Sequence, residues 1–258
     1  MVSSPVSEEP VIRVEGLTIG WGERVLMEDL EFEIRRGEIF VILGGSGSGK
    51  STLLRHLVGL EVALAGRIEL AGVGAPADAR GAPPFGVMFQ SGALFGSMTL
   101  AENVAVPLET WTRLDAATID VVVRSRLQLV GLDGFESYLP SEVSGGMKKR
   151  AGIARALMLE PALLFFDEPS AGLDPITAVE LDQLIVTLSR DLGITVVIVT
   201  HELASIFLVA DSCIVLDKTA KGIVAQGNPH RLRDESQIPF VHNFFTRSSP
   251  SVPASERG

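Results

Sequence analysis

Residues 39–51 read Ile39-Phe-Val-Ile-Leu-Gly-Gly-Ser-Gly-Ser-Gly-Lys-Ser51. The first five are apolar in succession, which predicts a strand buried on both faces. From Gly44 onward the residues fit the pattern G-x-x-x-x-G-K-[ST], and apolar residues from Leu53 to Val58 then recur at helical spacing. Because a glycine-rich loop between a buried strand and a helix is the context typical of true phosphate loops, we predict that this loop binds the phosphates of a nucleotide.

The predicted phosphate loop has residues suited to a triphosphate and its metal ion. Its glycines allow the backbone to wrap closely around phosphate groups, so that successive N–H groups point inward, and the positive end of the following helix faces them. Lys50 can reach the β- and γ-phosphates, and the Ser51 hydroxyl can ligate Mg²⁺. The expected phosphate-binding residues are Gly44, Gly45, Ser46, Gly47, Ser48, Gly49, Lys50, Ser51 and Thr52.

Two carboxylates follow a second apolar run, Leu163-Leu-Phe-Phe-Asp-Glu168. A buried strand that ends in this way places both acids at the carboxyl edge of the sheet, where the phosphate loop also emerges. We expect Asp167 to hold the metal ion through water and Glu168 to polarise the attacking water, since phosphoryl transfer depends on positioning and charge stabilisation. The alternative, two solvated acids at a strand end, is disfavoured by the upstream phosphate loop.

The rest of the chain predicts an α/β fold with a largely parallel core sheet. Residues from Val11 to Glu38 alternate between apolar and polar, as in antiparallel strands with one solvated face. Between residues 91 and 160 the strand patterns disappear and helix starts occur at Thr99 and Asp115, which predicts an inserted helical subdomain. Further buried strands are expected at Phe85–Phe89, Ala162–Phe166 and Thr195–Val199, and a closing hairpin at Cys213–Leu216 and Gly222–Ala225.

These patterns divide the chain into three parts. Residues 1–10 are expected to be a flexible N-terminus, and residues 11–227 one nucleotide-binding domain with its helical subdomain at about residues 91–160. Residues 228–258 form a C-terminal extension that ends in a Ser/Pro-rich, partly disordered tail. The extension carries an apolar face for which little local core is left, and we expect it to reach across to a second subunit; the residues are Phe240, Val241, Phe244 and Phe245.

Composition excludes several classes of protein. The 258 residues include 32 acidic against 22 basic side chains, a formal charge of −10 that repels nucleic-acid backbones. A single cysteine, Cys213, allows no internal disulfide and fits a reducing compartment. The first ten residues do not resemble a signal peptide, and residues 193–216 are interrupted by charged groups, so we predict a cytoplasmic chain that meets a membrane only through a partner.

From Val11 to about Gly227 the sequence resembles the nucleotide-binding subunits of ATP-binding-cassette (ABC) transporters. The family signature, most often Leu-Ser-Gly-Gly-Gln, matches Val143-Ser-Gly-Gly-Met147, and Ser170-Ala-Gly-Leu-Asp174 resembles the D-loop. The resemblance implies an ABC cassette of the phosphate-loop NTPase class, with ATP and Mg²⁺ as cofactors. It also implies that Gln90 is the Q-loop glutamine and a further metal ligand, and that His201 is the switch histidine that acts with Glu168 in catalysis. The ring of Trp21 would stack on adenine, and Asp174 would be the D-loop aspartate. The signature residues that would act in trans are Ser144, Gly145, Gly146 and Met147.

The signature departs from its commonest form at both ends, with Val143 in place of leucine and Met147 in place of glutamine. Ser144 and the two glycines after it can still offer a hydroxyl and backbone N–H groups at a helix N-terminus. We therefore expect phosphate binding to survive and the polar contact of the glutamine to be absent.

The resemblance further implies how the protein works. Two copies form a head-to-tail homodimer in which Lys50 of one subunit and Ser144 of the other enclose the same ATP. ATP binding closes the dimer, and hydrolysis with product release reopens it. This motion is passed to a multi-spanning membrane permease docked near Gln90 and the helical subdomain. The chain is then peripheral, on the cytoplasmic face of the inner or plasma membrane.

Four segments resemble the ATPases of Mla-type lipid transporters, which work with lipid-binding proteins of the mammalian-cell-entry (MCE) type and accessory subunits. They are Met88–Phe95, Ser144–Met147, Phe166–Pro169 and Gly172–Thr177. The resemblance implies phospholipid or lipid transport between membranes. The ATPase of an amino-acid or other small-solute importer is the alternative, and a soluble ABC ATPase without a transport role is less favoured.

The residues that follow Gln90 allow two interpretations. Ala93, Leu94 and Phe95 form a short apolar stretch that could contact the permease. The same three residues could instead belong to the core of the helical subdomain. The sequence leaves both open.

Overall fold

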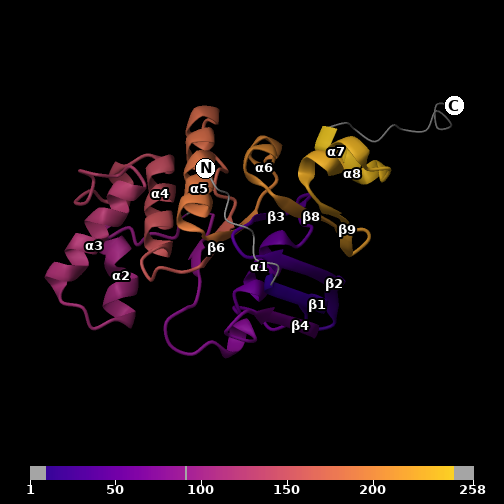
Figure 1. The fold of residues 1–258 in the computed structure, drawn as a ribbon, viewed down its shortest axis with the longest axis horizontal. Helices are drawn as coiled ribbons and strands as arrows, with labels where there is room; N and C mark the ends of the chain where they lie inside the picture. The colour runs from indigo at the N-terminus through magenta and orange to yellow at the C-terminus, as the bar shows by residue number, and fades with distance from the viewer. Residues whose placement is uncertain (1–9, 91, 247–258) are drawn as a thin grey trace.

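An antiparallel sheet begins the fold in the computed structural model, which describes residues 10–90 and 92–246 (Figure 1). Its strand order is β2-β1-β4, from β1 (Pro10–Trp21), β2 (Arg24–Arg35) and β4 (Ala65–Leu70). In β2 the residues Leu30, Phe32 and Ile34 are buried while the acids between them are exposed. The predicted alternation and the one solvated face are therefore confirmed.

The second sheet is the core of the molecule and has the strand order β5-β6-β7-β3-β8-β9. All neighbouring strands are parallel except the edge pair β8 and β9. The predicted α/β class with a mixed, largely parallel sheet is confirmed. The strands are β3 (Ile39–Gly44), β5 (Gly86–Met88), β6 (Leu163–Asp167), β7 (Thr195–Val199), β8 (Ser212–Asp217) and β9 (Gly222–Gly227).

Strand register brings the ends of three strands together at one edge of this sheet. Val199, the last residue of β7, lies opposite Ile42 of β3 and Asp167 of β6. The chain segments that leave these strands, including the glycine-rich loop after β3, therefore emerge side by side. Ligands of open α/β sheets bind at this carboxyl edge.

Each face of the core sheet is covered by a different hydrophobic core. Phe40 and Ile42 of β3 pack with α1 (Lys50–Leu57) and the antiparallel sheet, whereas Ile39, Val41 and Leu43 face the other core. Every residue of β3 is buried for this reason. The second core includes α5 (Pro175–Leu192) and α6 (Leu203–Val209).

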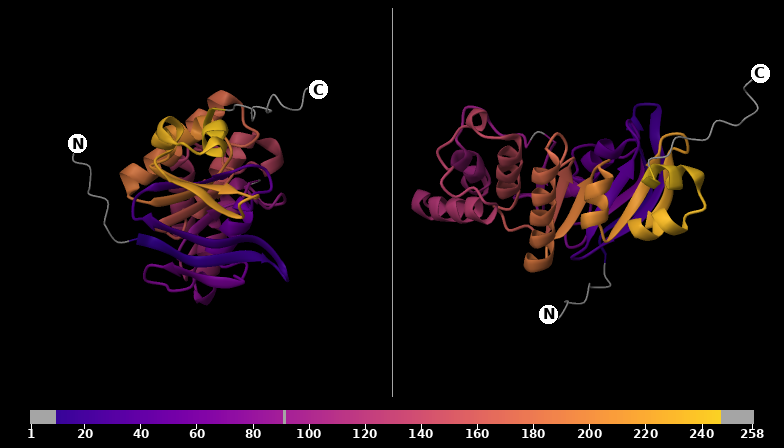
Figure 2. Two further views of the ribbon diagram at one scale, coloured as in Figure 1. Left: turned by 90° about the vertical axis from the view of Figure 1, so that its right-hand side faces the viewer. Right: turned by 90° about the horizontal axis from the view of Figure 1, so that it is seen from above.

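A helical group projects from one end of the core sheet (Figure 2). It contains α2 (Leu100–Trp111), α3 (Ala116–Leu129) and α4 (Gly145–Ala156), together with the short 3-10 helix η2 (Pro140–Glu142); a second one, η1 (Pro76–Asp78), follows β4. Both predicted helix starts are confirmed: Thr99 forms a capping box with Glu102, and the Asp115 side chain accepts a hydrogen bond from the Thr118 backbone.

The C-terminal helices α7 (Pro229–Glu235) and α8 (Pro239–Thr246) pack onto the chain's own core. On α8, Val241 and Phe245 are buried, and the Phe245 ring lies 5.7 Å from the Phe207 ring of α6 between centroids. The expectation that this apolar face lacks a local core is therefore wrong for Val241 and Phe245. The expected contact of the extension with a second subunit stays a prediction. The expected N-terminal flexibility at residues 1–9 and the expected disorder at 247–258 concern residues outside the described part.

Phe245→Ala is expected to lower the free energy of unfolding by about 3 kcal/mol, because it removes a large buried ring and leaves a cavity. Phe240→Ala is a matched control on the same helix, with 38% of the residue exposed, and should cost less than about 1 kcal/mol. Urea unfolding of both variants measures the difference. Equal losses would contradict the anchoring of α8 by Phe245.

Candidate nucleotide-binding site

The glycine-rich loop between β3 and α1 forms one wall of a cleft of about 570 Å³ at the carboxyl edge of the core sheet. All nine predicted phosphate-binding residues, from Gly44 to Thr52, line this cleft. Gln90, Glu168 and His201 line it as well, although they come from distant parts of the sequence. The structure thus brings together most of the residues that the sequence singled out.

Close packing explains the glycine at the start of the loop. Gly44 has a φ of +153°, and a Cβ placed there would lie 2.4 Å from the Ser48 hydroxyl and 2.6 Å from the Leu216 carbonyl oxygen. A side chain would therefore push β8 away from the loop. Gly49, with a φ of +86°, allows the loop to turn directly into α1.

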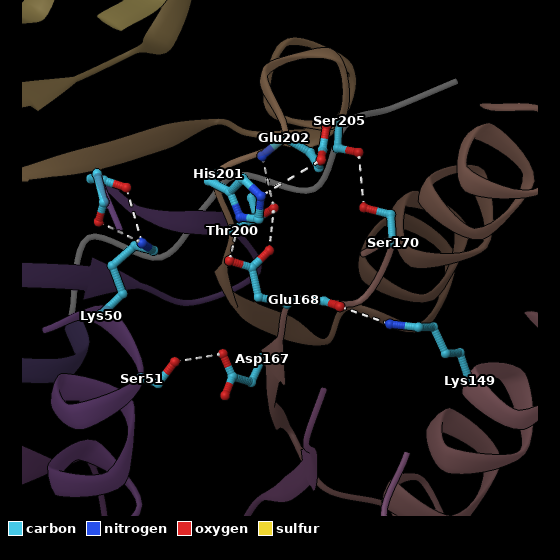
Figure 3. Close-up of polar contacts among 12 residues, drawn as sticks. Lys50, Ser51, Lys149, Asp167, Glu168, Ser170, Thr200, His201, Glu202 and Ser205 are labelled. Carbon is cyan, nitrogen blue, oxygen red and sulfur yellow. Dashed lines mark hydrogen bonds and ion pairs between the residues drawn. The ribbon is translucent and has the colours of Figure 1, made fainter. Parts of the chain in front are cut away.

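Lys50 lies at the base of the loop with its ammonium group held by backbone oxygens (Figure 3). Its Nζ donates to the carbonyls of Gly44 at 2.9 Å and Gly45 at 3.1 Å. Burial lowers the pKa of Lys50, and the nearby carboxylates of Glu168 and Asp167 oppose this shift. The result is a cation held by two backbone carbonyls inside the glycine-rich loop, where it can meet phosphate oxygens.

Ser51 and Asp167 form a pair of oxygen donors beside the loop. The Ser51 hydroxyl donates to Oδ1 of Asp167 at 3.1 Å, and burial raises the pKa of the Asp167 carboxyl. Hydroxyl and carboxylate oxygens fit Mg²⁺, which usually takes one or two protein ligands and completes its shell with phosphates and water. Residues 10–90 and 92–246 contain no cluster of three or more His, Cys, Asp or Glu side chains that could hold a metal ion.

Glu168 is the carboxylate with the most contacts in the cleft (Figure 3). Its Oε1 lies 2.7 Å from Nδ1 of His201, and its Oε2 accepts a hydrogen bond from the Thr200 hydroxyl at 3.2 Å. The backbone of Glu168 has a φ of +50°, a left-handed conformation that is costly for a residue with a side chain. Strain of this kind concentrates at functional sites, because only a rigid surrounding structure maintains it.

The signature lies outside this cleft. Ser144 is the N-cap of α4, where its hydroxyl accepts a hydrogen bond from the Met147 backbone, and both Ser144 and Gly145 are exposed. Gly146 is buried against Thr177, and Met147 packs against the main core. The exposed end of α4 therefore offers a hydroxyl and free N–H groups away from the chain's own phosphate loop.

Two further predicted residues also lie apart from the cleft lining. Asp174 caps α5, where it accepts a hydrogen bond from the Thr177 hydroxyl that lowers the pKa of its carboxyl. Trp21 ends β1 with 51% of its surface exposed, opposite Arg24 in the hairpin. Neither residue lines the cleft.

Three residues of the site were not predicted from the sequence. Thr200 contacts Glu168, Phe244 of α8 lines the cleft, and Lys149 of α4 donates to the backbone of Gln90 and Glu168. For Lys149 a sequence signal does exist, since it shares a helical face with Gly146 and Ile153, three residues before it and four after. Gly146, Lys149 and Ile153 are all buried.

Among the described residues no helix is both long and apolar enough to cross a lipid bilayer.

The geometry agrees with comparisons to known proteins. The probable ribonucleotide transport ATP-binding protein mkl of Mycobacterium leprae is 41% identical over 239 residues, covering 91% of this chain and 68% of that protein. The intermembrane phospholipid transport system ATP-binding protein MlaF of Escherichia coli K12 is 41% identical over 229 residues, covering 87% of this chain and 84% of that protein. This chain thus spans about two thirds of the mycobacterial relatives' length and most of the enterobacterial one.

Solved structures show the same cassette. The cbiO1 protein of Clostridium perfringens, part of an ABC transporter complex, superposes with a TM-score of 0.79 at 30% identity, covering 88% of this chain and 92% of that one. A dimeric ATP-binding cassette, MJ0796 bound to ADP and Pi, superposes with a TM-score of 0.73 at 26% identity, covering 84% and 98%. The family model described as ABC transporter matches residues 27–171. The chain therefore belongs to the ABC transporter family, as one of its ATP-binding and ATP-hydrolysing subunits.

Proposed function

We propose that the chain powers a membrane permease that moves phospholipid between membranes. The observation that carries the proposal is the 41% identity to the intermembrane phospholipid transport protein over 84% of that protein's length. The mycobacterial relatives, named for ribonucleotide transport, are equally identical but extend well beyond this chain. The segments Met88–Phe95 and Gly172–Thr177, which resemble Mla-type ATPases, favour the lipid substrate over a small solute.

The catalytic step is assigned to the residues gathered in the cleft. Glu168 accepts a proton from the attacking water, and His201 holds this carboxylate in place through its 2.7 Å contact. Lys50 and the loop N–H groups bind the phosphates. Bound Mg²⁺ would neutralise phosphate charge, with the Ser51 hydroxyl, the Gln90 side chain and, through water, Asp167 as its protein ligands.

The working form is proposed to be a homodimer. Ser144 and Gly145 are exposed on α4 and do not line the cleft of their own subunit, so their N–H and hydroxyl groups are free to bind the ATP of a second copy. A head-to-tail arrangement places Asp174 and Met147 near the same boundary. Trp21, exposed at the end of β1, is free to stack on the adenine of its own subunit's nucleotide.

The permease is proposed to dock on an apolar groove beside the helical group. This groove of about 430 Å³ is lined by Phe95, Pro107 and Trp111, and the two aromatic residues are 53% and 47% exposed. Leu94 instead packs against the core. Phe95 therefore fits the interpretation as a permease contact, and Leu94 fits the interpretation as part of the core. Docking here would hold the chain at the cytoplasmic face of the inner or plasma membrane, with an MCE-type lipid-binding protein and accessory subunits as further partners.

Copurification from gently solubilised native membranes tests this proposal. A tagged Glu168→Gln variant, held in the ATP-bound state, is expected to recover a multi-spanning permease and an MCE-domain protein, identified by mass spectrometry. A matched Lys50→Met preparation, which is expected to bind ATP more weakly, serves as the comparison for ATP-dependent contacts. Recovery of a solute-binding protein would favour the small-solute importer, and recovery of no membrane protein would favour a soluble ATPase.

A further inference from the structure

Lys149 is a buried lysine of α4 whose ammonium group bonds to two segments of the catalytic site. Its Nζ donates to the Glu168 carbonyl at 2.8 Å, drawn in Figure 3, and to the Gln90 carbonyl at 3.1 Å. The residue is 6% exposed. Burial lowers the pKa of Lys149, and the carboxylates of Glu168 and Asp167 oppose that shift. The buried ammonium is therefore bonded to the backbone carbonyls of two residues that line the nucleotide cleft.

A second cation of α4 holds the same Q-loop segment further along. The guanidinium of Arg155 donates to the carbonyls of Gly92 at 2.7 Å and Ala93 at 2.8 Å. Gly152, between the two cations, packs closely against Gly92. Helix α4 is thus tied to the segment after β5 at both points, but among the described residues only Lys149 joins it to Glu168 as well.

The position of Lys149 on α4 links its contacts to the exposed N-terminus of that helix. Ser144, the exposed N-cap, lies about 7.5 Å from Lys149 along the helix axis, from the rise of a regular α-helix. Over so short a distance a helix moves as a rigid body. A displacement at Ser144 must therefore move the ammonium group, and with it the two carbonyls that it holds.

We propose that Lys149 is a positioning residue that transmits movement of α4 to Gln90 and Glu168 of the same subunit. The proposal rests on the proposed head-to-tail dimer, in which Ser144 contacts the ATP bound by the partner. ATP bound at one site then adjusts the catalytic carboxylate of the other site. The two sites of the dimer hydrolyse ATP cooperatively for this reason.

Substitution of Lys149 tests the proposal through cooperativity as well as rate. Lys149→Met keeps much of the apolar stem but loses the donors, and we expect kcat to fall about 100-fold and the Hill coefficient for ATP to fall to about 1. Affinity for a fluorescent ATP analogue should change less than about threefold, because the phosphate loop is untouched. Lys149→Arg, which keeps charge and donors, is expected to restore most of kcat and a Hill coefficient above 1.

Lys148→Met is the matched control, since Lys148 is the adjacent, partly exposed lysine of α4 and should leave both quantities at wild-type values. An unchanged Hill coefficient and kcat in Lys149→Met would overturn the proposal. So would a loss of melting temperature in Lys149→Met that Lys149→Arg repairs without restoring cooperativity, because that pattern indicates a structural role. Glu168→Gln, measured in parallel, distinguishes failure of the catalytic assignment from failure of the role of Lys149. Retained hydrolysis in Glu168→Gln would contradict the catalytic assignment. Loss of hydrolysis in Glu168→Gln together with wild-type behaviour of Lys149→Met would contradict only the role of Lys149.

Discussion

Replacement of Glu168 by glutamine is expected to preserve ATP binding and to reduce steady-state hydrolysis by about 10²- to 10⁴-fold. The amide has the shape of the carboxylate and can still accept the hydrogen bond from Thr200. It cannot accept a proton from water, however, so the step that depends on a base is lost. Lys50 and the phosphate loop are unchanged, which is why the affinity for ATP should remain.

The measurement compares ATPase rate and ATP-analogue affinity in the same preparations. Glu109→Gln is a matched control, because Glu109 is an exposed acid on α2. It should leave both quantities unchanged. Wild-type hydrolysis by Glu168→Gln would remove Glu168 from the proposed mechanism, and a parallel loss of binding would show that the substitution damages the cleft rather than the chemistry.

Much of the site could be predicted because its residues follow fully apolar strands. The strands that end at Gly44, Asp167 and Val199 are buried throughout, so hydrophobicity alone located them. In a parallel sheet their ends share one edge, which brings the loop residues and Glu168 together. His201 follows the third of these strands, but its role was implied by the resemblance to ABC cassettes and not by the strand pattern. Local sequence and sheet geometry agree here, so the location of these residues could be predicted, whereas their roles stay predictions.

The parts that could not be predicted depend on contacts between distant segments. Residues of α8 bury their apolar face against Phe207, and nothing local in the sequence indicates that α6 leaves room for them. For Lys149 the only sequence signal is its helical spacing with Gly146 and Ile153, and this weak signal is opposed by the basic run Lys148-Lys149-Arg150, which is typical of a solvent-exposed helix face. The left-handed backbone at Glu168 is likewise imposed by its surroundings, including the hydrogen bond from its N–H to the Val199 carbonyl.

Lys50 and Ser144 bind the same ATP from different subunits of the proposed dimer. Substitution of either residue should therefore abolish hydrolysis. Lys50→Met removes the cation that faces the phosphates, and we expect ATP affinity to fall at least about thirtyfold, corresponding to about 2 kcal/mol. Ser144→Arg places a bulky side chain at the exposed start of α4 and should block closure of the dimer. Because Ser144 lies outside its own cleft, its substitution should leave ATP binding to the isolated subunit within about threefold of wild type.

The most direct test of the two-copy site is the ATPase activity of a mixture of these two variants. In a mixed dimer, Lys50 of the Ser144→Arg subunit and Ser144 of the Lys50→Met subunit form one intact site. Equal amounts should therefore recover at most about a quarter of the wild-type rate, since half the dimers are mixed and each has one working site of two. Coupling through Lys149 lowers this value, because the second site of a mixed dimer is defective and cannot act on the working one. Recovery of activity on mixing two inactive preparations is the predicted result. No recovery, while the mixed dimer forms, would contradict the proposal that Lys50 and Ser144 of different copies enclose the same ATP.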